Sequence, residues 1–101
     1  MIRHKFGAKR CETDGIKFPS KLEAKYYGLL KIRQQAGEVI FFLRQVPFYL
    51  PGGIKYVVDF QVFLADGTVE FIDTKGKDTP LSLSKRTICE ALYPIEIRIV
   101  K

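Results

Sequence analysis

The sequence predicts an α/β fold with a mixed sheet, in which a helix is followed by three strands, a second helix and a last strand. Three observations predict it. A helix with a recognisable start comes first, glycine-containing turns then separate three apolar runs, and a second helix joins the third run to an alternating segment. Such a strand–helix–strand connection places the last strand parallel to a neighbour.

Length and composition favour one folded domain over residues 1–101. Hydrophobic residues make up 47% of the chain and aromatic residues 13%, which is enough for a modest core. Residues 1–18 are expected to form a basic N-terminal arm or a hairpin, because Asp14-Gly15 is a turn signal. No apolar run approaches the length of a membrane span, so we expect no membrane partner and a cytoplasmic protein.

The first helix is predicted over residues 20–37. Ser20 can cap it, and Glu23 stands three residues later, so the two form a capping box in which the Glu23 carboxylate would bond back to the Ser20 amide. Gly37 is well placed to end the helix. The expected inward stripe consists of Leu22, Tyr26, Leu29 and Leu30.

Three strands are predicted next, over residues 39–50, 55–64 and 68–75. Pro47 is expected to interrupt or bend the first of them, because proline has no N–H group for a sheet ladder. The run "PGG" at residues 51–53 is the turn that joins the first two strands.

The second helix is predicted to start at Thr79-Pro80 or at Ser82 and to end before Pro94. Its apolar side chains are expected to point inward, and these are Ile88, Cys89 and Leu92. The alternating segment "IEIRIV" at residues 95–100 is the last strand.

The loop between the second and third strands decides whether Asp59 can meet Asp73. If Asp66-Gly67 were a two-residue loop, Asp59 would lie opposite Thr74, on the wrong face for Asp73. If residues 65–67 form a three-residue loop with its glycine in the left-handed conformation, Asp59 lies directly opposite Asp73.

In the three-residue alternative two acids oppose each other on a sheet, an arrangement that like-charge repulsion destabilises. Lys75 shares their face but supplies one positive charge against two, so a bound divalent metal ion would complete the site. The plainer interpretation is that these residues belong to a solvated sheet face. Glu70 is such a residue, because it points to the face opposite Asp73.

The net charge of +6 and the pI near 9.4 favour a polyanionic partner. The basic residues are clustered at the N-terminus, around Gly76 and on the second helix, and the clusters contain Arg3, His4, Lys5, Lys9, Arg10, Lys75, Lys77, Lys85 and Arg86. Cys11 and Cys89 are expected to be reduced thiols that pack in an intracellular protein. One histidine, His4, argues against a structural zinc site and a Cys–His nucleophile pair.

The segments "VVDF" and "EFIDTKGK" resemble the signature of the PD-(D/E)XK nuclease superfamily. In that signature an acid on one strand precedes a (D/E)-x-K motif on the next, and Asp59 and Asp73-Thr74-Lys75 match these positions. Glu23 matches the glutamate that the preceding helix often supplies, and Val58 stands where the signature has proline.

A wider resemblance covers about residues 14–100. The segments "SKLEAKYYGLL", "QVPFYLP", "YVVDF", "DTKG" and "IEIRIV" follow one another much as in the phage junction-resolving endonuclease I family. They also resemble a family of small phage proteins thought to be resolvases or endonucleases. The resemblance implies a restriction-endonuclease-like core for the predicted order of elements.

The resemblance implies a metal-dependent DNA endonuclease of a phage, most often a Holliday junction resolvase that acts as a homodimer on branched DNA in the host cytoplasm. Asp59, Asp73, Glu23 and the backbone carbonyl of Thr74 would hold one or two Mg²⁺ ions, for which Mn²⁺ can substitute. Lys75 would act in catalysis together with the three acids. The residues expected to grip the DNA are Arg3, Lys5, Lys9, Arg10, Lys77 and Lys85.

Two other functions stay open at this point. A transposase-type subunit that cleaves DNA ends has a similar opening and core, and a DNA-binding module that has lost its chemistry would keep the basic surface. Gln45 is either a neighbour of the site or an ordinary strand residue.

Overall fold

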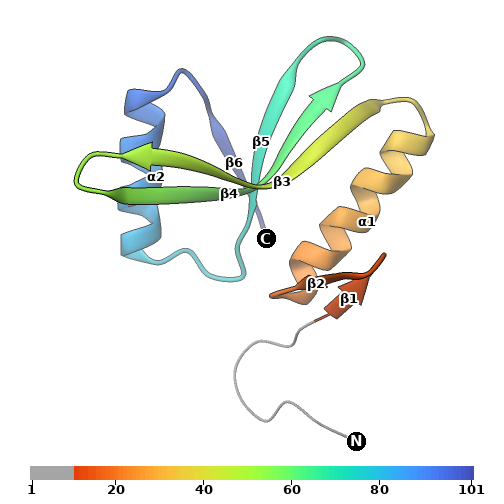
Figure 1. The fold of residues 1–101 in the computed structure, drawn as a ribbon, viewed down its shortest axis with the longest axis horizontal. Coiled ribbons are helices and arrows are strands. Elements are labelled where there is room, and N and C mark those ends of the chain that lie inside the picture. The colour runs from red at the N-terminus through yellow and green to blue at the C-terminus, as the bar shows by residue number, and fades with distance from the viewer. Residues whose placement is uncertain (1–10) are drawn as a thin grey trace, which may run out of the picture.

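The computed structural model describes residues 11–101, and Figure 1 shows how its elements are arranged. The first hairpin comes before the first helix, and the second helix comes before the last strand. The elements are, in order, β1 (Cys11–Thr13), β2 (Ile16–Phe18), α1 (Lys21–Gln35), β3 (Val39–Leu50), β4 (Ile54–Leu64), β5 (Val69–Thr74), α2 (Pro80–Leu92) and β6 (Ile97–Val100).

The central sheet has four strands in the order β3-β4-β5-β6. β4 is antiparallel to both β3 and β5, and β6 is parallel to β5 as the crossover through α2 requires. The predicted order of helix, three strands, helix and strand is therefore confirmed for a mixed α/β domain. Figure 1 shows α1 on the right of the strands and α2 on the left.

Both helices start at the predicted caps. Ser20 caps α1, because its side-chain oxygen accepts a hydrogen bond from the Glu23 amide at 3.1 Å. Thr79 caps α2 in the same way by accepting from the Ser82 amide at 3.2 Å, and Pro80 opens the helix.

The first hairpin forms around the predicted turn, with Thr13 paired to Ile16. Asp14 and Gly15 both have positive φ angles, 54° and 75°, as a two-residue hairpin turn of this kind requires. The Tyr27 hydroxyl donates to the Asp14 carboxylate at 3.0 Å, which fastens the hairpin to α1.

The loop between β4 and β5 has three residues, Ala65, Asp66 and Gly67, and the register is the one that the longer loop predicts. Phe60 pairs with Ile72, and the Leu64 amide donates to the Thr68 carbonyl at 2.9 Å across the loop. Gly67 has a φ of 91°, which a residue with a Cβ rarely adopts.

The interior has two clusters of buried side chains, one on the α1 side and one on the α2 side. The first contains Phe18, Tyr26, Tyr27, Leu30, Val39, Phe60, Val62 and Ile72. The second contains Leu50, Tyr56, Val58, Cys89 and Ile97. Cys89 therefore packs as predicted, whereas the side chain of Cys11 lies outside the described residues.

The paired strands β3 and β4, called the β3–β4 ribbon below, contribute buried side chains to both clusters. Phe60 belongs to the α1 cluster and Val58 to the α2 cluster, although side chains two residues apart on a regular strand share a face. The pairing register is unchanged across this point, and it puts Gln45 opposite Asp59. Gln45 has a φ of 54°, so the backbone turns there.

Pro47 was expected to bend or interrupt the strand over residues 39–50, which is β3, and that prediction is wrong. Pro47 pairs with Val57 inside an unbroken β3. The register shift of this strand lies between Val39 and Phe41, and its one residue with a positive φ is Gln45. Proline is tolerated because β3 is the edge of the sheet, where one side of the strand needs no ladder partner.

The predicted inward faces of both helices are partly wrong. Leu29 on α1 is 44% exposed, and Ile88 and Leu92 on α2 are 43% and 53% exposed. Two charged residues, Glu23 and Arg86, are buried on these helices. Each has a partner of opposite charge, Arg44 and Asp78 respectively, which makes its burial tolerable.

Candidate functional site

Asp59 on β4 and Asp73 on β5 oppose each other where the β3–β4 ribbon turns. The Asp59 backbone amide donates to the Asp73 Oδ1 atom at 3.2 Å, which ties the two residues together across the strands. Asp73 is 1% exposed, and Asp59 is half-buried beside it. A solvated sheet face would leave both carboxylates in water, so this structure contradicts the plainer interpretation of the pair.

Thr74 holds the carboxylate of Asp59. Its backbone amide and its hydroxyl both donate to Asp59 Oδ2, each at 2.8 Å. The predicted contribution of Thr74 was its backbone carbonyl. The structure adds these two donors, which orient the carboxylate and favour its charged form.

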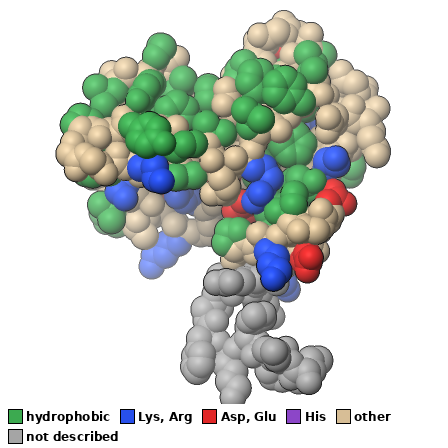
Figure 2. All heavy atoms as spheres, in the orientation of Figure 1, with side chains coloured by type: hydrophobic (Ala, Val, Ile, Leu, Met, Phe, Trp, Pro, Cys, Tyr) green, Lys and Arg blue, Asp and Glu red, His purple; other side chains and the backbone are tan. Residues whose placement is uncertain are grey.

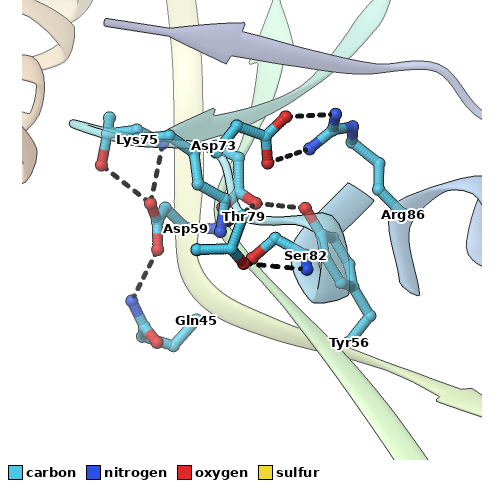
Figure 3. A network of polar contacts seen from close by, with 10 residues as sticks. Gln45, Tyr56, Asp59, Asp73, Lys75, Thr79, Ser82 and Arg86 are labelled. Carbon is cyan, nitrogen blue, oxygen red and sulfur yellow. Dashed lines mark hydrogen bonds and ion pairs between the residues drawn. The ribbon is translucent and has the colours of Figure 1, made fainter. Parts of the chain in front are cut away.

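Asp73 is held by a tyrosine and a lysine. The Tyr56 hydroxyl donates to Asp73 Oδ2 in a very short hydrogen bond, and the Lys75 ammonium lies 3.4 Å from the same oxygen. Figure 3 shows the Tyr56 hydroxyl directed at Asp73, with Lys75 drawn nearby. Burial, followed by the hydrogen bond to Asp73, raises the pKa of Tyr56 well above its usual range, so the phenol stays a donor.

Glu23 reaches the site from the first turn of α1. It is 2% exposed, and its Oε2 atom accepts hydrogen bonds from Arg44 at 3.2 Å and from Gln45 at 3.0 Å. The predicted bond from the Glu23 carboxylate back to the Ser20 amide is therefore wrong, because this carboxylate is turned toward β3. Only the Ser20 half of the box is formed.

Gln45 joins Glu23 to Asp59. Its side-chain nitrogen donates to Glu23 Oε2 and also lies 3.4 Å from Asp59 Oδ1, and Figure 3 shows the second of these contacts. The structure thus places Gln45 beside the predicted acids. Arg44 completes this side of the site, with its guanidinium 4.5 Å from the centre of the Phe18 ring.

The surroundings of Asp59 and Glu23 disfavour the charged forms of these two carboxylates. Burial, together with the nearby charge of Asp73, raises the pKa of Asp59, although the hydrogen bonds from Thr74 oppose the shift. Burial and the charge of Asp59 likewise raise the pKa of Glu23. Both shifts indicate carboxylates that an additional cation would stabilise.

The donor chemistry of the site suits a hard divalent cation such as Mg²⁺, which prefers carboxylate and amide oxygens. The acids are spread along the turn of the ribbon, with Glu23 on the α1 side and Asp73 on the α2 side. Within residues 11–101 no three acidic, histidine or cysteine side chains are grouped tightly enough to form a metal site. The three acids are instead joined in sequence, Glu23 to Asp59 through Gln45 and Asp59 to Asp73 through the Asp59 amide.

The predicted DNA-binding residues are only partly described. Lys77 is exposed in the loop after β5, and Lys85 is half-buried on α2. Arg3, Lys5, Lys9 and Arg10 lie outside the described residues. Arg86, next to Lys85, is buried and forms a bidentate ion pair with Asp78, at 3.2 and 2.7 Å.

Sequence reasoning missed Tyr56 and Arg44 and left Gln45 open. One signal was available, because the short turn at residues 51–53 pairs Leu50 with Ile54 and fixes the register of β3 on β4. That register puts Gln45 opposite Asp59. No comparable signal pointed to Tyr56, since its approach to Asp73 depends on the turn of the ribbon.

Within residues 11–101 neither helix is long and apolar enough to cross a membrane. No curated protein sequence and no solved structure matches the chain. One family model does match, over residues 3–100, and its description is "Protein of unknown function (DUF1064)". A match over nearly the whole chain shows the family, and the protein belongs to the DUF1064 family.

Proposed function

We propose that this protein is a Mg²⁺-dependent DNA endonuclease with a restriction-endonuclease-like core. One observation supports the proposal above the others: Asp59 and Asp73 oppose each other, with Lys75 on the same strand end and Glu23 linked to them through Gln45. Carboxylates that can hold a divalent metal ion and a lysine that can stabilise charge on a phosphate are suited to the hydrolysis of a phosphodiester. The element order and the mixed sheet agree with such a core.

A bound Mg²⁺ or Mn²⁺ ion would supply a Lewis acid that withdraws charge from the phosphate and acidifies water. Asp59 and Asp73 would hold it through carboxylate oxygens, with Glu23 and the Thr74 carbonyl as further ligands. The Lys75 ammonium would stabilise the charge that grows on the phosphate oxygens when water bonds to phosphorus and the bond to the leaving sugar oxygen breaks. Tyr56 would keep Asp73 in position by its hydrogen bond.

The basic residues would hold the DNA backbone. Four of the 17 lysines and arginines, Arg3, Lys5, Lys9 and Arg10, come from the first ten residues. Lys77 lies in the loop that follows β5, and Lys85 lies on α2. Figure 2 shows Lys and Arg side chains across the middle and lower part of one face of the molecule. Contacts of this kind supply affinity without sequence preference.

The substrate we propose is branched DNA, such as the four-way junction that a phage resolvase cuts in the host cytoplasm. Two symmetric cuts need two sites, and each chain supplies one, so the active enzyme would be a homodimer. Sedimentation that detects only monomer at micromolar concentration, with and without junction DNA, would contradict the resolvase assignment while leaving the nuclease assignment intact.

The experiment that tests the proposal compares a four-way junction with a linear duplex of the same sequence in Mg²⁺. Faster cleavage of the junction supports a resolvase, whereas cuts at the ends of particular duplexes support a transposase-type nuclease. Binding without cleavage in Mg²⁺ or Mn²⁺ contradicts the proposal and identifies an inert DNA-binding module.

A further inference from the structure

Gln45 has an unusual backbone for its position. Among residues 11–101 only two residues other than glycine have a positive φ, and the other, Asp14, stands in a hairpin turn that requires it. Gln45 lies inside the 12-residue strand β3, where the ladder keeps the same register on both sides. A positive φ costs free energy for a residue that has a side chain, and residues in this conformation are concentrated at functional sites.

The turn of the ribbon explains the φ of Gln45 but does not explain the glutamine. Glycine would adopt a φ of 54° with less strain and would let Phe42 and Phe48 face their two clusters equally well. The side chain must therefore contribute something that glycine lacks. What it contributes in the structure is one amide nitrogen between two carboxylates, at 3.0 Å from Glu23 Oε2 and 3.4 Å from Asp59 Oδ1.

An amide is well suited to that place. Two carboxylates face it, so the hydrogen-bond partners assign the nitrogen end of the amide to them. The nitrogen joins the acids without adding a positive charge that would compete with a divalent cation.

We propose that Gln45 is a positioning residue, whose side-chain amide nitrogen spaces Glu23 and Asp59 for a divalent cation. The inference rests on the proposed function, because it assumes that these acids receive a cation. It concerns a residue on β3, outside the strands and the helix that carry the acids and the lysine.

The test substitutes Gln45→Gly, which removes the side chain with its amide and can keep the backbone φ of 54°. Calorimetric titration with Mn²⁺ should show that its affinity falls about tenfold or more, as for other residues that orient metal ligands. Its melting temperature without added metal should equal or exceed that of the wild type, because the strain at φ 54° is relieved. A merely structural role would lower the melting temperature and leave the Mn²⁺ affinity unchanged.

Gln61→Gly is the matched control, since Gln61 is a glutamine on β4 with an ordinary φ and no place in the site. It should lower the melting temperature and keep the wild-type Mn²⁺ affinity. If Gln45→Gly binds Mn²⁺ as tightly as the wild type, the inference about Gln45 is wrong and the nuclease proposal stands. If the wild type itself binds no Mn²⁺ at millimolar concentration, the cation site fails and the inference falls with it.

Discussion

The backbone amide of Asp59 donates to the carboxylate of Asp73 at 3.2 Å, so that one acid of the pair holds the other in place across β4 and β5. The contact follows from the three-residue loop at Gly67, which sets the register of the two strands. Burial, together with the nearby charge of Asp73, disfavours the charged form of Asp59, which is an arrangement that function rather than stability favours.

Removing one of these charges should therefore stabilise the fold. In Asp59→Asn the remaining oxygen can still accept from the amide and hydroxyl of Thr74, while the buried charge beside Asp73 is gone. We expect a higher melting temperature than the wild type at neutral pH in thermal unfolding without metal. Asp66→Asn is the control, because Thr68 lowers the pKa of Asp66 and its charge is favoured, so this variant should not gain stability. A less stable Asp59→Asn would contradict the account.

Ser20 and Glu23 should have separable effects, since only Ser20 acts as a cap. Ser20→Ala should lower the free energy of unfolding by about 1 kcal/mol and leave the cleavage rate per folded molecule unchanged. Glu23→Gln keeps the shape of the side chain and removes its charge from the site, so cleavage should fall about 100-fold with little change in stability. Urea unfolding and a cleavage assay of both variants test the separation, and equal activity in Glu23→Gln would remove Glu23 from the site.

The ion pair of Asp78 with Arg86 should make stability depend on pH. The hydrogen bonds from Arg86 lower the pKa of Asp78 below its ordinary value of 3.8. The stabilising effect is therefore complete above pH 3.8 and is lost as the pH falls through the lowered pKa. Urea unfolding should show Asp78→Asn less stable than the wild type at neutral pH, with a gap that closes in acid. The exposed control Glu96→Gln should show no such gap, and a gap for Asp78→Asn that persists at all pH values would contradict the assignment.

Substitutions at Lys75 and Lys77 should have different effects, one on the cleavage rate and the other on DNA binding, although the residues stand two positions apart. Lys75 lies 3.4 Å from Asp73, so Lys75→Ala should lower the rate of cleavage by about 100-fold or more while DNA affinity changes little. Lys77 is exposed, so Lys77→Ala should weaken binding and reduce the salt slope of log K by about 0.9, with the rate at saturation preserved. Binding isotherms at several salt concentrations and single-turnover cleavage measure both quantities. The reverse pattern would exchange the two roles.

Much of this fold could be predicted from local sequence. The cap at Ser20 and the turn at Asp14-Gly15 are short-range signals that were found where expected. The cap at Thr79 and the three-residue loop ending at Gly67 are each one of two alternatives that the sequence offered. The register of β4 on β5 followed from that loop, which is why the opposition of Asp59 and Asp73 was accessible before the structure.

The inward faces of the helices could not be predicted in the same way. A helical pattern shows which side chains share a face, but contacts with distant residues decide which face is buried. On α2 the buried positions include Arg86, whose partner Asp78 lies eight residues earlier, while Ile88 and Leu92 remain exposed. The approach of Tyr56 to Asp73 likewise needs the turn of the ribbon, which no single stretch of sequence encodes.

The measurement that tests the central claim most directly is cleavage of a labelled four-way junction by the wild type and by Asp59→Asn, each with Mg²⁺ and with a chelator. The account predicts cleavage by the wild type only when Mg²⁺ is present, and none by Asp59→Asn, which should still bind the junction at least as tightly because a negative charge near the DNA is removed. Cleavage by Asp59→Asn at the wild-type rate, or by the wild type in chelator, would contradict it.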